Sequence, residues 1–142
     1  RGALERRVGA LGIGENVCFK GRTADMAGAY SSHSAFVLSS LYEGFGLVLI
    51  EAMRCGCTPV AFDCEYGPRE ILRNGESGII VPFRGLSREE RVAGLAEAIC
   101  GLIEEPARSR EMAERALAGR GRFDKEAIMD RWEALFGDIA AR

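Results

Sequence analysis

The chain has 142 residues, which suits a single domain large enough to bury a hydrophobic core. Its hydrophobic content of 47% is ordinary for a globular protein, and its net charge of −2 gives no electrostatic reason to expect nucleic acid as a partner. No apolar run approaches the roughly 20 residues that span a bilayer. The chain begins with Arg1 and not with an initiator Met, so we expect a fragment of a longer protein.

The first third of the chain predicts a helix, two strands and a second helix. Apolar residues at helical spacing favour a helix over 4–11, and a short apolar run favours a strand over 17–19. The secondary structure of residues 30–34 is ambiguous from the sequence. The continuous apolar run over 35–38 is typical of a strand covered on both faces, and a helix is expected over 46–54.

Strands and helices continue to alternate through the middle of the chain. A strand is predicted over 58–62, a short helix over 67–72 and a buried strand over 78–82. This alternation favours βαβ units and a parallel sheet, in which ligands bind beyond the carboxyl ends of the strands. The loops over 39–45 and 63–67 lie at such ends.

Helices are predicted for the remainder of the chain. Ser87 and Glu90 form a capping box that marks a helix start. The apolar face of this helix is expected to contain Val92, Leu95, Ala96, Ile99, Leu102 and Ile103. Two more helices are expected over 106–119 and from about Lys125. The stripe on the last one, expected to form core or to pack against another domain, contains Ile128, Trp132, Leu135, Phe136 and Ile139.

The cysteines favour free thiols over a metal site or disulfides. They are odd in number and lie in apolar sequence, which predicts burial in a reducing compartment: Cys18, Cys55, Cys57, Cys64 and Cys100. Cys55 and Cys57 lack the C-x-x-C spacing, and His33 is the only histidine. We therefore expect no metal.

Glu43 and Glu51 bracket a glycine-containing loop that opens into an aliphatic run. Gly44 and Gly46 allow close approach of the backbone, and the first N–H groups of the following helix can bind an anion. Glu43 can accept hydrogen bonds from sugar hydroxyls. Glu51, about two turns along the helix, can bind vicinal hydroxyls of a ribose. Alternatively, Glu43 is an ordinary loop acid and Glu51 a solvated acid beside Arg54.

The segment from Ser40 to Met53 resembles the E-x7-E signature of retaining glycosyltransferases of family 4, which have the GT-B architecture. Residues 57–61 are similar to the Pro-containing strand that follows in this family, and residues 67–82 resemble its next block. The resemblance extends from about Leu4 to Phe136. It implies an α/β fold with a Rossmann-like parallel sheet and flanking helices, the second half-domain of a GT-B fold without its first strands.

The resemblance also implies transfer of a sugar from a nucleotide diphosphate sugar with retention of configuration. Glu43 would be catalytic, and Glu51 would bind the ribose. The residues expected to bind donor sugar or phosphate are Gly44, Phe45, Gly46, Leu47 and Arg69. Lys20 and Arg22 are expected near the nucleotide. Arg69, Lys20 and Arg22 are equally compatible with a surface role. We favour front-face transfer in which N–H groups stabilise the departing diphosphate, so no metal or other cofactor is expected.

A GT-B enzyme has two Rossmann-like domains, and the first largely holds the acceptor. We expect residues 1–142 to be a partial C-terminal domain, inactive by itself, with its helices over 106–140 packed toward the missing N-terminal domain. Expected partners are a nucleotide sugar and a glycan, lipid-linked or small-molecule acceptor in the cytoplasm. A basic set is either a solvated helix face or a contact with the inner face of the membrane: Arg108, Arg110, Arg115, Arg120, Arg122 and Lys125.

Other functions stay open at this point. A dinucleotide-binding oxidoreductase is suggested by G-x-G at 12–14 and at 44–46, but Val17 and Leu49 occupy the third glycine positions. A non-catalytic nucleotide-sugar-binding module would have the same acids. Two other kinds of GT-B protein, a sugar-nucleotide epimerase and a phosphorylase, are further alternatives. The epimerase uses different acids. The phosphorylase needs a lysine that binds its cofactor, and neither Lys20 nor Lys125 has a suitable setting.

Overall fold

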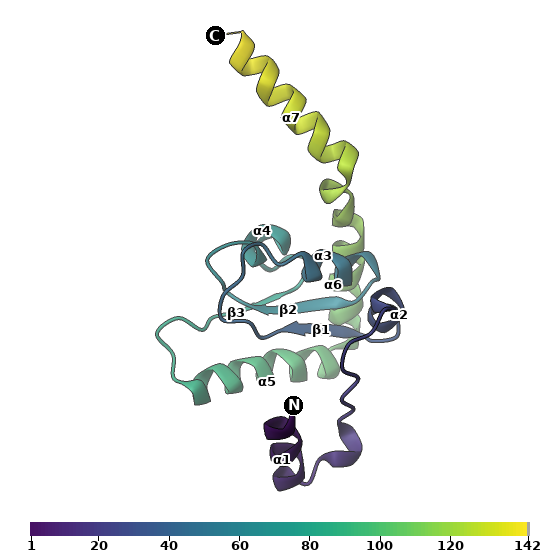
Figure 1. Cartoon of the computed structure of the whole chain (residues 1–142), viewed down its shortest axis with the longest axis vertical. Helices are drawn as coiled ribbons and strands as arrows, with labels where there is room; N and C mark the ends of the chain where they lie inside the picture. The colour runs from purple at the N-terminus through teal and green to yellow at the C-terminus, as the bar shows by residue number, and fades with distance from the viewer. Residues whose placement is uncertain (142) are drawn as a thin grey trace.

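A parallel three-stranded sheet in the order β1-β2-β3 forms the centre of the computed structural model, which describes residues 1–141 (Figure 1). The strands are the apolar runs β1 (Ala35–Leu38), β2 (Thr58–Phe62) and β3 (Ile79–Val81). Val37 lies opposite Val60 in the β1–β2 pair. β2 is buried at every position because it has a strand on each side and helices on both faces. The α/β class and these three predicted strands are confirmed.

Alternate residues of β2 contact different layers of helices. Ala61 joins the core cluster formed with helices α3, α4 and α6, whereas Val60 and Phe62 join the cluster formed with α5. α5 begins at the predicted capping box of Ser87 and Glu90. The helices of this α/β body are α3 (Leu47–Arg54), α4 (Pro68–Ile71), α5 (Arg88–Glu104) and α6 (Pro106–Gly119), and the short 3-10 helix η2 (Arg73–Gly75) follows α4.

The N-terminal part differs from the sequence prediction. It consists of α1 (Gly2–Leu11), the short 3-10 helix η1 (Gly14–Asn16) and α2 (Met26–Ser31), and α1 has no buried residue. The predicted strand over 17–19 is wrong. These residues lie in the connection to α2, away from the sheet (Figure 1), where no strand within residues 1–141 pairs with them.

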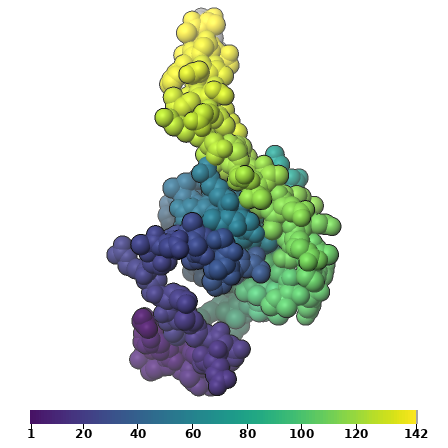
Figure 2. Space-filling view, turned by 90° about the vertical axis from the view of Figure 1, so that its right-hand side faces the viewer, coloured from purple at the N-terminus to yellow at the C-terminus, as the bar shows by residue number. Residues whose placement is uncertain are grey.

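The C-terminal helix α7 (Lys125–Ala140) follows the short 3-10 helix η3 (Arg120–Phe123) and extends away from the α/β body (Figures 1 and 2). α7 has no buried residue. Trp132 stacks on Phe136 with ring centroids 5.6 Å apart, yet the two residues are 50% and 60% exposed. Within residues 1–141 the apolar stripe therefore forms no core, and its packing against another domain stays a prediction.

The buried face of α5 is narrower than predicted. Leu102 is only 8% exposed and packs against the sheet together with Leu95 and Ala98. Val92 and Ile103, which were expected on the same face, are 60% and 73% exposed. The sheet covers a single stripe of this helix, so apolar residues beside the stripe remain in contact with solvent.

The loop after β2 meets the loop after β1 at the backbone of Gly67. This residue precedes α4 with a φ of 93°, and a Cβ on it would lie 1.6 Å from the carbonyl oxygen of Phe45. Only glycine permits such an approach. The Sγ atom of Cys64 also donates a hydrogen bond to the carbonyl oxygen of Ser40, at 3.2 Å. The two loops at the carboxyl edge of the sheet therefore pack as one unit.

We expect Gly67→Ala to destabilise the fold far more than Gly75→Ala. Both glycines have positive φ, which costs a side chain about 1–2 kcal/mol, but nothing lies within 4 Å of a Cβ on Gly75. The clash with Phe45 should add at least about 2 kcal/mol at Gly67. Urea unfolding of both variants measures the difference, and equal free energies of unfolding would contradict the close contact.

The cysteines are free, but they are less uniformly buried than predicted. Cys57 and Cys64 are buried and Cys55 is half-buried, whereas Cys18 and Cys100 are exposed. The two exposed thiols lie in the connection to α2 and on the solvent side of α5, outside the core that the sequence pattern suggested. Burial raises the pKa of Cys57 to about 11, and Cys55 adds to this effect.

Thiol labelling tests this burial. At pH 8 we expect iodoacetamide to modify Cys18 and Cys100 in the native protein while Cys57 and Cys64 stay largely unmodified, because the thiolate is the reactive species and both buried thiols have raised pKa values. Mass spectrometry identifies the modified sites. All five cysteines should react in urea. Fast labelling of Cys57 in the native protein would show that this thiol is not buried.

Candidate functional site

The E-x7-E segment spans the loop after β1 and the first two turns of α3. Glu43 is half-buried in the loop, and Glu51 is exposed on the helix. Gly46 precedes the helix with a φ of 92°, which turns the chain from loop into helix at a cost that only glycine avoids. The N–H groups of Leu47 and Val48 lie in the first turn, where the helix supplies no carbonyl partners. Such N–H groups and the helix dipole can bind an anion.

Glu43 lies close to the loop that follows β2. Burial first, and then the negative charge of Glu43, raise the pKa of Cys64 in that loop. Because Cys64 is bonded to the carbonyl of Ser40, the loop with Glu43 is fixed to the end of β2 at this point. The two loops predicted to lie at the carboxyl ends of neighbouring strands are thus brought together.

Arg69 forms an ion pair with Asp63 at this edge. The Nε atom of Arg69 donates to Oδ1 of Asp63 at 2.6 Å, and its Nη2 atom bonds to Oδ2. The side chain of Arg69 is 63% exposed and that of Asp63 is 19% exposed. Planar two-point pairing orients the guanidinium while leaving its other donors accessible to solvent. A phosphate contact by Arg69 stays a prediction.

Glu51 pairs with a residue that the sequence did not reveal. The hydroxyl of Tyr30 on α2 donates to Oε2 of Glu51 at 3.2 Å. Arg54, the alternative partner considered from helical spacing, instead donates to Oδ1 of Asp124 at 2.5 Å. Sequence patterns predicted no helix over 26–31. Asp25 could have indicated it, because Asp at an N-cap accepts a backbone hydrogen bond, here from the N–H of Gly28 at 2.8 Å.

Within the described part of the chain, no hydrogen bond or ion pair holds Lys20 or Arg22 at the candidate site. Both are exposed in the connection between η1 and α2. Within residues 1–141, no hydrogen bond or ion pair joins either side chain to Glu43 or Glu51. Their expected place near the nucleotide stays a prediction.

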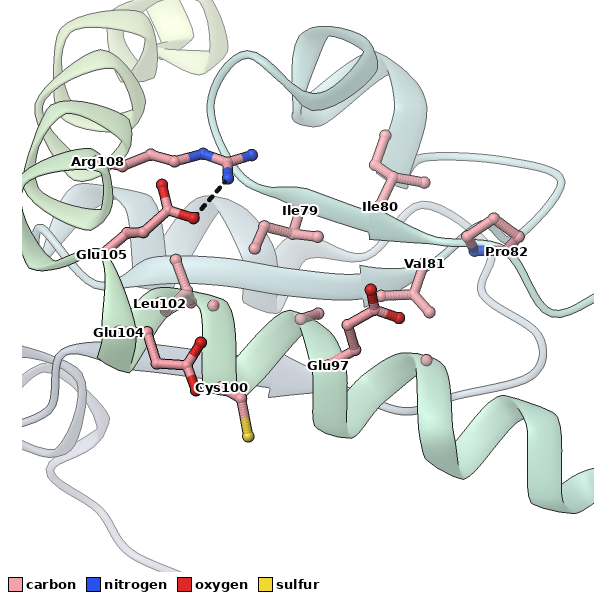
Figure 3. Close-up of a pocket in the computed structure, with 13 residues that line it drawn as sticks. Ile79, Ile80, Val81, Pro82, Glu97, Cys100, Leu102, Glu104, Glu105 and Arg108 are labelled. Atoms are coloured by element: carbon pink, nitrogen blue, oxygen red, sulfur yellow. Dashed lines mark hydrogen bonds and ion pairs between the residues drawn. The ribbon is translucent and has the colours of Figure 1, made fainter.

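Two pockets lie beside the sheet, and only one of them includes residues of the E-x7-E segment. A pocket of about 410 Å³ is lined by Phe45, Leu47, Ile50, Glu51, Arg54, Glu70, Phe123, Ile128 and Arg131. Another, of about 500 Å³, lies between β3 and α5 (Figure 3). Glu105 and Arg108 form an ion pair of 3.4 Å at its end, and no residue of the E-x7-E segment lines it. The first pocket is therefore the one that adjoins the candidate site.

Part of the predicted basic set makes local contacts. Arg108 pairs with Glu105, Arg115 lies 4.0 Å from Glu111, and Arg122 bonds to the carbonyl of Ile71. Arg108 and Arg115 fit a solvated helix face, whereas Arg122 is half-buried and bonds across the fold to the end of α4. Within residues 1–141, no three His, Cys, Asp or Glu side chains are grouped so that they could hold a metal ion. In the same part of the chain, every helix is too short or too polar to cross a membrane.

The family model for glycosyl transferases group 1 matches residues 2–118. An exopolysaccharide phosphotransferase of Streptomyces coelicolor is 36% identical over 140 residues, which make up 98% of this chain and 14% of that protein. The chain spans between 14% and 36% of the length of the curated relatives it matches.

Solved structures match the whole fold. A GtfA/B complex has a TM-score of 0.82 at 25% identity and covers 99% of this chain and 28% of that one. Anabaena HepE in complex with UDP-glucose has a TM-score of 0.78 at 28% identity and covers 96% of this chain and 36% of that one. The family match spans more than half of the sequence, and the fold matches the C-terminal half of GT-B proteins. The chain therefore belongs to the glycosyl transferases group 1 family.

Proposed function

We propose that this chain is the donor-binding half of a retaining glycosyltransferase that uses a nucleotide diphosphate sugar. The observation that supports it best is the placement of Glu43 and Glu51. One carboxylate lies in the loop at the carboxyl edge of a parallel sheet, and the other lies on the helix that this loop opens. Binding sites of open α/β sheets lie at this edge.

The acids have different roles in this proposal. Glu43, half-buried beside the loop after β2, binds hydroxyls of the donor sugar near the reacting carbon. The diphosphate lies over the first turn of α3, where the N–H groups of Leu47 and Val48 stabilise the negative charge that grows as it departs. Glu51 accepts hydrogen bonds from the ribose hydroxyls. No step of this scheme requires a metal.

The donor nucleotide is proposed from likeness. Anabaena HepE, which is 28% identical and has a TM-score of 0.78, is described in complex with UDP-glucose. We therefore propose a uridine diphosphate sugar as the donor. We also propose that the chain binds this donor by itself but transfers no sugar until the acceptor-binding domain is present.

Substitution of the two acids should separate their roles. In titrations of the 142-residue chain by NMR, we expect Glu51→Gln to weaken UDP binding about tenfold or more, because hydrogen bonds to a charged group contribute roughly 1.5–3 kcal/mol. Glu43→Gln should leave the affinity for UDP nearly unchanged and remove the additional affinity for UDP-glucose.

The matched control is Glu104→Gln, which removes an exposed acid on α5 outside the E-x7-E segment. It should change neither affinity. If the affinity for UDP is the same in all four proteins, and the affinity for UDP-glucose is also the same in all four, the assignment of both acids is overturned. Transfer of sugar by the 142-residue chain alone would overturn the requirement for a second domain.

Arg69 and Asp63 provide an independent test of the phosphate site. If Arg69 binds the diphosphate, Arg69→Gln should weaken UDP binding more than UMP binding. Asp63→Asn should instead retain or strengthen UDP binding, because it releases the guanidinium from its ion pair at little cost in stability for an exposed pair. Parallel losses in Arg69→Gln and Asp63→Asn would indicate that the pair only supports the loop.

A further inference from the structure

Tyr30 is a buried residue whose hydroxyl group faces the candidate nucleotide site. It lies on α2 and is 4% exposed, yet its hydroxyl hydrogen bonds to the exposed carboxylate of Glu51 at 3.2 Å. The two residues are 21 positions apart in the sequence. The contact therefore exists only because α2 packs beside α3.

The core fixes the tyrosine ring in place. The rings of Tyr30 and Phe36 form a T-shaped pair, with an interplanar angle of 88° and centroids 5.3 Å apart. Ala52 and Cys57, which are 0% and 1% exposed, complete the buried cluster around the ring. A hydroxyl held in this way has one position, whereas an exposed glutamate on a helix ordinarily samples several rotamers.

The hydrogen bond from Tyr30 uses only one of the two carboxylate oxygens of Glu51. Tyr30 contacts Oε2 only, so Oε1 and the remaining lone pair of Oε2 can still accept hydrogen bonds. Burial first, and then the charge of Glu51, raises the pKa of Tyr30 to about 12. Its hydroxyl consequently keeps its proton and acts as a donor at neutral pH.

We infer that Tyr30 is a positioning residue that holds the carboxylate of Glu51 in the orientation that binds the two ribose hydroxyls. This inference rests on the proposed function, in which Glu51 binds the ribose. Tyr30 does not contact the nucleotide. Because Tyr30 already restricts the side chain of Glu51, this side chain loses less conformational entropy when the nucleotide binds. For one immobilised side chain this difference corresponds to an affinity about three- to tenfold higher.

The test is Tyr30→Phe, which removes the hydroxyl and retains the ring against Phe36. NMR titration of the 142-residue chain should give a dissociation constant for UDP that is about three- to tenfold higher than in the unaltered chain. The affinity for 2′,3′-dideoxyuridine diphosphate should be the same in both proteins, because that probe has no ribose hydroxyls for Glu51 to bind. Equal weakening of both nucleotides would reveal a merely structural role and overturn the inference.

Glu51→Gln separates failure of this inference from failure of the proposed function. If Glu51→Gln leaves UDP binding unchanged, the ribose assignment is wrong, and the inference falls with it. If Glu51→Gln weakens UDP binding but Tyr30→Phe does not, only the positioning role is wrong. In the Glu51→Gln background, Tyr30→Phe should cause no further loss.

A measurement without nucleotide checks the contact itself. The pKa of Tyr30, followed by NMR of the labelled ring, should fall in Glu51→Gln because the negative charge has been removed, and should stay above the usual 10 because the ring is still buried. An unchanged pKa would show that the hydroxyl and the carboxylate are not coupled, which would overturn the inference.

Discussion

The site depends on the contact between the backbone of Gly67 and the carbonyl of Phe45. A Cβ atom cannot fit there, so the start of α4 lies directly against the loop that holds Glu43. The hydrogen bond from Cys64 to Ser40 repeats this link a few residues away. A loop after a strand is usually among the more mobile parts of a fold. Here the contacts of Gly67 and Cys64 hold it against the loop after β2, which suits the sugar-binding role that we propose for Glu43.

Burial of one face of α3 determines where Glu51 lies on this helix. Leu49, Ala52 and Met53 are completely buried against the sheet and its neighbouring helices. With these side chains in the core, helical geometry leaves Glu51 on the outer surface beside α2. Tyr30 on α2 donates a hydrogen bond to its carboxylate there. Leu49, which lies between the two acids, and Ala52 and Met53, which follow Glu51, therefore determine which side of α3 carries Glu51.

Sequence patterns predicted the three strands of the sheet and the helices α3 to α6, but not α2, whose Tyr30 is buried. The run over 58–62 is a strand covered on both faces, and its continuous apolar character follows from that burial. The run over 17–19 looks similar but has no strand to pair with within residues 1–141, so local composition misled the prediction. The contact of Tyr30 with Glu51 could not be predicted either, because it depends on how two helices distant in sequence pack. Glycine and acid spacing indicated the loop and helix of the site, but not the residues that support them.

The extent of the family match agrees with where the packing ends. It stops at residue 118, next to the end of α6 at Gly119, and the buried core of the described residues ends close to the same place. Beyond it, Phe123 still packs against the core, with its ring 6.2 Å from that of Phe45, whereas α7 buries nothing. The ion pair of Arg54 with Asp124 is about half exposed, and such pairs contribute little. Phe123 and Arg122, which bonds to the carbonyl of Ile71, thus anchor the C-terminal segment. Through Phe123 the C-terminal segment contacts the ring of Phe45, the residue that precedes Gly46 at the start of α3.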